Sequence, residues 1–354
     1  MSTITSSRGT TSPPTAGRLI NRIMRWSARA FLGLLALIGG LAAVGAIYQA
    51  IATTHDRRAY PPPGQLIDVG GYKLHIFCMG EGSPTVILDH VGAGNSAQWG
   101  LVQPEIAKMT RVCAYDRAGF GWSDPGPAPR DARQNMQELH ALLTNAHIAP
   151  PYILVGHSFG GDVARLYADQ YRDQVIGMVL VDPGTLFDTP GVPPEINAQW
   201  QAEDQTIMRL APLLSRLGVM RLTAMAGLVP SHGDLPAPSG AAFDALNLTT
   251  TFWDTLSAQN QAMPATSAQV LGASYDYGAL PLVVLSADQS TDRSRQIWTE
   301  LNAELATRST KGIHRIVVGA SHMALALDRD HAQATIAAIQ QVVHAVRTPM
   351  LIQP

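Results

Sequence analysis

A serine stands where a strand-like segment of this chain meets a helix-like one. The apolar run 152–155 enters a Gly-x-Ser-x-Gly turn centred on Ser158, and a helical pattern over 162–171 leaves it. Such a turn pushes the serine hydroxyl out above the sheet, and the start of the helix offers free N–H groups to a developing negative charge. Gly156 and Gly160 let backbone segments approach more closely than a Cβ would permit. The pattern favours a nucleophilic serine over an ordinary glycine-rich turn.

A nucleophilic serine needs a base, because its hydroxyl is a weak nucleophile at neutral pH. Of the 11 histidines in the chain, His322 is the best candidate, since it follows an apolar strand-like run in a turn of small residues. A carboxylate must then hold the histidine in the correct tautomer and stabilise its cation. Asp182 ends one strand-like run and Asp288 follows another, so both are candidates for this acid.

Alternating strands and helices must position these residues. Strand-like runs cover residues 73–78, 84–89, 111–115, 152–156, 176–181, 282–287 and 313–318. Helical patterns cover residues 131–146, 160–172, 293–308 and 331–346. This order predicts an α/β fold: a mostly parallel, doubly wound sheet with helices on both faces.

The alternation stops between two of the predicted strands. Residues 186–280 instead hold helix-like pieces around 194–217 and 240–262, and the strand pattern resumes at Leu282. The insertion falls at the end of the sheet where Ser158 opens. We therefore expect it to form a helical cap over the site.

The chain resembles the α/β-hydrolase superfamily from about Gln65 to Arg347. Three motifs carry the resemblance: the serine turn, or nucleophile elbow, at Ser158, an Asp-Arg-x-Gly-x-Gly-x-Ser turn at 116–123, and a late Gly-x-x-His at 319–322. In that family the catalytic triad follows the order serine, acid, histidine, which this chain can supply. The resemblance thus implies a hydrolase fold with a helical cap.

The resemblance also bears on the oxyanion hole and on the acid. It implies that the N–H groups of Phe159 and Gly92 bind the oxyanion. Most members place the acid after the penultimate strand, which favours the Asp288 region, although the usual Gly-x-x-Asp spacing is missing here. Some members, haloalkane dehalogenases among them, use the end of the preceding strand, which is Asp182. The two carboxylates stay equal candidates.

Composition excludes several classes of function. The net charge is −2, charged residues make up 15% of the 354 residues, and no basic stripe is present, so we expect no nucleic-acid partner. No His-Glu-x-x-His, Cys-x-x-Cys or similar ligand spacing occurs, so we expect neither a metal nor a cofactor.

The N-terminal part differs in kind from the rest. Residues 1–29 are polar and then basic, and we expect them to be disordered and cytosolic. The 23 residues of 30–52 carry no charge, which predicts a transmembrane helix followed by a linker over 53–64 and a hydrolase domain over 65–347. Arginines before the span place the catalytic domain outside the cytoplasm. An A-x-A-like site at 50–52 leaves a cleaved signal peptide open as an alternative to the anchor we favour.

The chain has two cysteines, Cys78 and Cys113, on strands that are neighbours in the superfamily's strand order. Export would permit a disulfide between them. Two separate buried thiols are an equal alternative, because adjacency does not guarantee bonding geometry.

These features predict a membrane-anchored serine hydrolase that cleaves a small-molecule, lipophilic carboxylic ester through an acyl-enzyme on Ser158. An acyltransferase or a cofactor-free peroxidase could use the same triad. A catalytically silent binding protein on this scaffold is the third possibility. Enzymes with an aspartate nucleophile are disfavoured because the elbow carries a serine.

Overall fold

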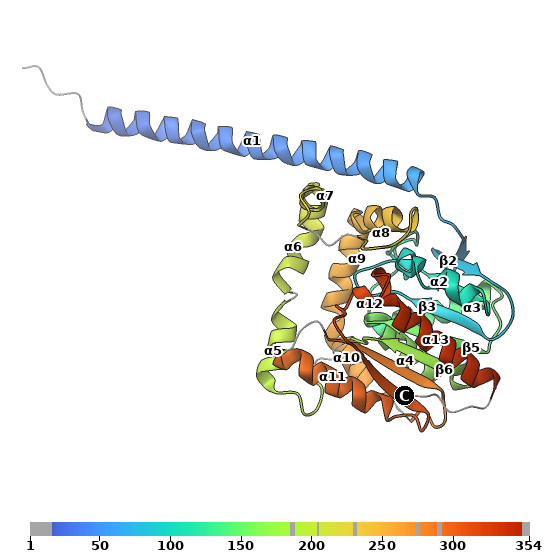
Figure 1. The fold of residues 1–354 in the computed structure, drawn as a ribbon. Coiled ribbons are helices and arrows are strands. Elements are labelled where there is room, and N and C mark those ends of the chain that lie inside the picture. The colour runs from blue at the N-terminus through green and yellow to red at the C-terminus, as the bar shows by residue number, and fades with distance from the viewer. Residues whose placement is uncertain are drawn as a thin grey trace, which may run out of the picture.

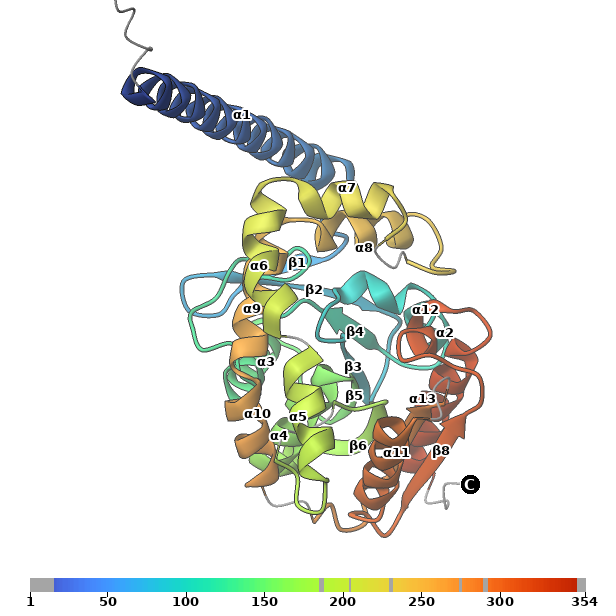
Figure 2. The ribbon, with the colours of Figure 1, turned by 90° about the vertical axis from the view of Figure 1, so that its left-hand side faces the viewer.

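The computed structural model describes residues 16–184, 188–203, 205–228, 232–273, 276–288 and 292–348. Its centre is an eight-stranded sheet in the order β1-β2-β4-β3-β5-β6-β7-β8 (Figures 1 and 2). The strands are β1 Gln65–Asp68, β2 Lys73–Met79, β3 Thr85–Asp89, β4 Val112–Tyr115, β5 Tyr152–His157, β6 Val175–Val181, β7 Leu282–Ala287 and β8 Gly312–Val317. The pairs β1–β2 and β2–β4 are antiparallel, and the remaining pairs are parallel.

This architecture confirms the predicted doubly wound, mostly parallel sheet. Each predicted strand is present within two residues of its expected bounds. The edge strand β1 was not predicted, because it has four residues of which three are exposed, so it lacks an apolar run.

Helices cover both faces of the sheet. The domain helices outside the cap are α2 Gln103–Ala107, α3 Ala132–Asn145, α4 Phe159–Gln170, α11 Arg293–Ala306, α12 Ala324–Leu327 and α13 Ala332–Arg347, with short 3₁₀ turns at η1 Ser96–Gly100 and η2 Arg172–Gln174. Successive strand residues point to opposite faces. Leu154 of β5 therefore packs toward α3 and α4, and its neighbours Ile153 and Val155 pack toward α2 and α13.

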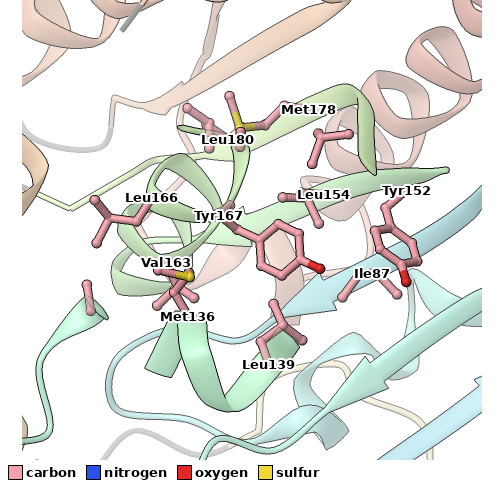
Figure 3. Packing of buried hydrophobic residues seen from close by; sticks show 14 of the residues in the cluster. Ile87, Met136, Leu139, Tyr152, Leu154, Val163, Leu166, Tyr167, Met178 and Leu180 are labelled. Carbon is pink, nitrogen blue, oxygen red and sulfur yellow. The ribbon is translucent and has the colours of Figure 1, made fainter. Parts of the chain in front are cut away.

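Figure 3 shows the first of these two cores. Leu154 of β5 and Met178 and Leu180 of β6 meet Val163, Leu166 and Tyr167 of α4, and Met136 and Leu139 of α3 close the cluster. All of these side chains are buried. The cluster holds α4 rigidly on the sheet, which matters because Ser158 immediately precedes that helix.

A helical insertion separates β6 from β7, as expected. Its helices are α5 Pro194–Glu203, α6 Gln205–Arg216, α7 Val219–Met225, α8 Ser239–Asn247, α9 Thr250–Gln261 and α10 Met263–Leu271. Helices α6, α7 and α9 share a small core in which Phe252 of α9, Ala211 of α6 and Met220 of α7 pack with Phe120 of the main domain. Residues 185–187 and 274–275, at the two ends of the predicted cap, lie outside the described residues.

The N-terminal helix is longer than the predicted span of 30–52. Helix α1 runs without a break over Ala16–Ala59 and projects from the domain (Figure 1). The expected disorder over 16–29 and the expected linker over 53–59 are therefore wrong, whereas residues 1–15 lie outside the described residues. Helix formers predominate in residues 16–29, whereas residues 53–59 are held against the cap by the ion pair of Asp56 with Arg221. The first proline of the following run, Pro61, stops the helix. Among the described residues, α1 is the helix long and apolar enough to cross a bilayer.

The two cysteines form a disulfide. Cys78 of β2 lies directly opposite Cys113 of β4 in the antiparallel register, and their sulfur atoms are bonded. Of the two alternatives from the sequence, the structure therefore contains the disulfide and not two separate thiols.

Candidate active site

Ser158 occupies the sharp turn between β5 and α4. Its backbone has φ 55° and ψ −121°, a conformation that non-glycine residues rarely adopt and that is maintained only by its surroundings. The Ser158 N–H donates to Val181 O at 3.0 Å, and Ser158 O accepts from Gly161 N at 2.7 Å. A Cβ on Gly156 would come within 2.3 Å of Gly160 O, so the close approach inferred from the sequence is present.

Asp182 and His322 lie together at the carboxyl edge of the sheet. The Asp182 Oδ2 to His322 Nδ1 distance is 2.7 Å, although the residues are 140 positions apart in the chain. Asp182 has φ 44°, which turns its carboxylate out of the line of β6, and its side chain is fully buried. The structure thus brings together the predicted histidine and one of the two predicted acids.

A second cation supports this carboxylate. Arg295 Nη2 donates to Asp182 Oδ1 at 2.7 Å, and the Ala287 N–H donates to the same oxygen at 3.2 Å. Burial alone would raise the pKa of Asp182, but the hydrogen bonds and charges of His322 and Arg295 outweigh burial and hold that pKa below its ordinary value of 3.8. Asp182 is therefore ionised at neutral pH.

Asp288 does not contact His322. Its Oδ1 accepts the Gly319 N–H at 2.5 Å, and its own N–H donates to Ala320 O at 3.1 Å. The carboxylate thus braces the turn that leads to His322. The structure therefore pairs His322 with Asp182 and not with Asp288, the other predicted acid, whose carboxylate is directed to this backbone N–H.

Two aromatic rings flank the His322 imidazole. His157 lies on one side, with ring centroids 4.8 Å apart, and its Nε2–H donates to His322 O at 3.0 Å. Burial, and then the charge of His322, lower the pKa of His157 to about 3, so this histidine is a neutral brace. Trp298 of α11 lies at 5.6 Å from the His322 ring. Within the described residues, the half-buried Ser158 hydroxyl makes no hydrogen bond with a protein group.

The two predicted oxyanion donors are neighbours. A Cβ built on Gly92 would lie 3.5 Å from the Cβ of Phe159. Arg117 holds the loop before Gly92, because its guanidinium pairs with Asp89 and donates to His90 O at 2.6 Å and Val91 O at 2.8 Å. Backbone carbonyls are thereby drawn toward Arg117, on one side of the loop.

Sequence reasoning missed two side chains at this site. Arg295 on α11 bonds Asp182 across 113 residues, and no local pattern marks that pairing. Gln259 on cap helix α9 is buried, and its Nε2 lies 3.0 Å from the Cβ that Gly92 lacks. A polar residue on the inner face of an otherwise packed cap helix was the only available signal.

In the part of the chain that the structure describes, no group of three or more His, Cys, Asp or Glu side chains is placed to hold a metal ion.

Comparisons with known proteins agree with the observed fold. The sequence model of the alpha/beta hydrolase fold matches residues 84–291. A 2-hydroxymuconate semialdehyde hydrolase of Pseudomonas sp. (strain CF600) is 35% identical over 126 residues, which cover 34% of this chain and 44% of that protein. The matched segment spans less than half the length of the first curated relatives.

Solved structures share the fold. A thermophilic esterase from Thermogutta terrifontis is 20% identical with a TM-score of 0.58, and the match covers 80% of this chain and 99% of the esterase. A bacterial membrane phospholipase A is 20% identical with a TM-score of 0.55, over 91% of this chain and 99% of the phospholipase. At these identities the likeness concerns the fold alone.

Proposed function

Because this chain belongs to the α/β-hydrolase family, we propose that it is a serine hydrolase that cleaves carboxylic esters through an acyl-enzyme on Ser158. The comparisons support a hydrolase. One observation carries the finer proposal: the 2.7 Å contact of ionised Asp182 with His322, beside an elbow whose serine has φ 55°. A hydrolase with an aspartate nucleophile would carry a carboxylate at position 158.

In the first half of the reaction, Ser158 Oγ attacks the ester carbonyl carbon while His322 Nε2 takes the hydroxyl proton. The tetrahedral intermediate collapses, and the proton passes from His322 to the departing alcohol. Water then attacks the acyl-enzyme with His322 again as base, which releases the acid and restores Ser158.

Two features stabilise the charges that develop. Asp182 faces the imidazolium at 2.7 Å, and Arg295 keeps that carboxylate ionised in a buried place. The N–H groups of Phe159 and Gly92 are the proposed donors to the oxyanion, and removal of one such donor typically costs a factor of about 10²–10³ in kcat.

The same proposal includes the membrane. We propose that α1 stays attached and anchors the protein with its N-terminus in the cytosol, because Arg22, Arg25 and Arg29 precede the charge-free stretch. Gln49 also contacts Leu248 and Arg221 of the cap, and removal of a signal peptide after Ala52 would abolish these contacts. An anchored enzyme meets lipophilic esters at high local concentration, which favours them as substrates.

Labelling with a fluorophosphonate tests the nucleophile. We expect one adduct on the full-length protein in detergent micelles, none on Ser158→Ala and an unchanged adduct on Ser321→Ala, a control next to His322. An unlabelled wild-type protein that is folded by circular dichroism would instead favour a silent binding protein. A p-nitrophenyl ester series, assayed with and without a competing alcohol, then distinguishes hydrolysis from acyl transfer by the products formed.

A further inference from the structure

The cap carries an exposed apolar surface beside the anchor helix. Leu222 and Met225 of α7 and Leu228 just after it are 57%, 77% and 75% exposed. Met220 of the same helix points inward, into the cap core with Phe252. The one charged residue of α7, Arg221, is buried. Helix α7 thus exposes leucine and methionine on its outer side and buries its only charged residue.

Helix α1 is locked to this part of the cap. Arg221 bonds Asp56 at 2.7 Å and Gln49 Oε1 at 2.9 Å, and Gln49 Nε2 donates to Leu248 O at 2.8 Å. A Cβ on Gly45 would come within 2.2 Å of Leu217 O, so the two backbones are in direct contact there. These contacts fix α7 at one level along α1, and Figures 1 and 2 both show α7 directly against it.

That level falls inside the apolar stretch. Tyr48, whose hydroxyl lies 3.8 Å from Met225 Sδ, stands four residues before Ala52, and Gly45 stands seven before it. With a rise of ~1.5 Å per residue, α7 lies about 6–10 Å inside the end of the charge-free span. Helices that lie in a membrane interface bury their apolar side to a similar depth of ~5–10 Å. Around the same level α1 itself exposes Val44, Ile47 and Ile51.

We propose that the outer side of α7, with Leu222, Met225 and Leu228, is immersed in the same lipid leaflet as the end of α1. The inference rests on the proposed membrane anchoring and commits to acyl chains of the bilayer as the partner. The cap is then an interfacial element, and esters reach the site from the membrane. The cap core joins α7 to the site, because Met220 of α7 packs with Phe252, Phe252 contacts Phe120, and Phe120 contacts His90 of the loop before Gly92.

Fluorescence quenching by brominated lipid tests the immersion. The full chain is reconstituted in phosphatidylcholine vesicles, with a bimane label on Met225→Cys or Leu228→Cys. The label is selective because both native cysteines are in the disulfide. Ile47→Cys on α1 is the positive control, and Val318→Cys, 80% exposed beyond β8, is the matched apolar control.

We expect mid-chain brominated phosphatidylcholine to remove at least about half of the fluorescence at 225, 228 and 47, and little at 318. Quenching at 47 without quenching at 225 and 228 overturns the immersion and leaves the anchor and the hydrolase proposal standing. A blue-shifted but unquenched label at 225 also overturns it, since a protein surface such as a second copy then covers α7. No quenching at 47 overturns the anchor as well.

A functional measurement separates this inference from the chemistry. In the double variant Met225→Asp with Leu228→Asp, we expect hydrolysis of a long-chain ester dissolved in the vesicles to fall by about ten-fold or more. Hydrolysis of soluble p-nitrophenyl acetate should stay unchanged, as should both rates in Val318→Asp. Equal loss on both esters would overturn the proposed route, whereas absence of any esterase activity in the wild type would refute the proposed function instead.

Discussion

Replacement of Arg295 by methionine should destabilise this protein far more than the loss of an ordinary ion pair. Arg295 is 11% exposed and its partner Asp182 is fully buried, so the pair is held out of water. Removal of one partner from a buried pair costs about 3–5 kcal/mol, because the other charge is left uncompensated. Arg308→Met is the matched control: its partner Glu304 is 62% exposed, and exposed pairs contribute about 0–1 kcal/mol.

The pH dependence of this loss follows from the pKa of Asp182. The wild-type carboxylate has a lowered pKa, so its contribution to stability is present above pH ~4 and is lost as the pH falls through the folded value. Without Arg295, one of the groups that oppose the effect of burial is gone, so the pKa of Asp182 rises. The gap between wild type and variant should therefore be widest at pH 7–8 and narrow toward pH 4–5, as the variant takes up a proton.

Thermal unfolding in detergent micelles, followed by tryptophan fluorescence, measures the effect. At ~2 °C or more per kcal/mol, Arg295→Met should lower Tm by at least about 6 °C at pH 8, and Arg308→Met by about 2–4 °C at most. Equal shifts in the two variants, or a gap that is the same at pH 8 and pH 4.5, would refute the argument that Arg295 compensates a buried charge.

Three further outcomes are expected. Asp182→Asn should lower kcat on p-nitrophenyl esters by up to about 10⁴-fold through the wrong histidine tautomer, whereas Asp288→Asn should stay within about ten-fold of wild type. Replacement of Cys78 and Cys113 by serine should lower the free energy of unfolding by about 4 kcal/mol, given the separation of 35 residues, as seen in thermal scans with and without dithiothreitol. Burial raises the pKa of Asp162 to about 7, so the folded protein is most stable with this carboxyl neutral, and that stability is lost as the pH rises through about 7. Asp162→Asn should therefore raise Tm at pH 8 and change it little at pH 4.5.

The parts of the site that were predictable from the sequence are those encoded by contiguous residues. Strand β5, the turn at Ser158 and helix α4 follow one another without interruption, so apolar run, glycines and helical pattern could be read together. The same holds for the turn of small residues before His322. The alternation of strand and helix patterns likewise predicted the doubly wound sheet.

The choice of acid needed the structure, because it depends on contacts between distant segments. Asp182 reaches His322 through a positive φ of 44° at the end of β6. An aspartate in the sequence does not by itself predict this rare conformation. Asp288 has the strand position that most superfamily members use, yet its carboxylate accepts the Gly319 N–H. Arg295 and Gln259 were missed for the same reason, since each acts across more than a hundred residues.

The error at the N-terminus has a different origin. Hydropathy marks the part of α1 that avoids water, and it does not report where a helix begins or ends. Residues 53–59 are polar, and they continue the helix because Asp56 finds Arg221 of the cap. The end of the apolar stretch and the end of the helix are thus set by different interactions.

That separation links α1 to the end of the molecule that carries Ser158. Because α1 continues past the apolar stretch, Asp56 joins Gln49 in reaching Arg221, and the cap is held directly by α1 instead of only through a loop. From α7 the contact continues through Met220 and Phe252 to Phe120, and from Phe120 to His90. With α1 in a bilayer, as proposed, its tilt would therefore move the cap relative to the sheet edge that carries Ser158. The effect of lipid on the rate should therefore be sought in the full chain.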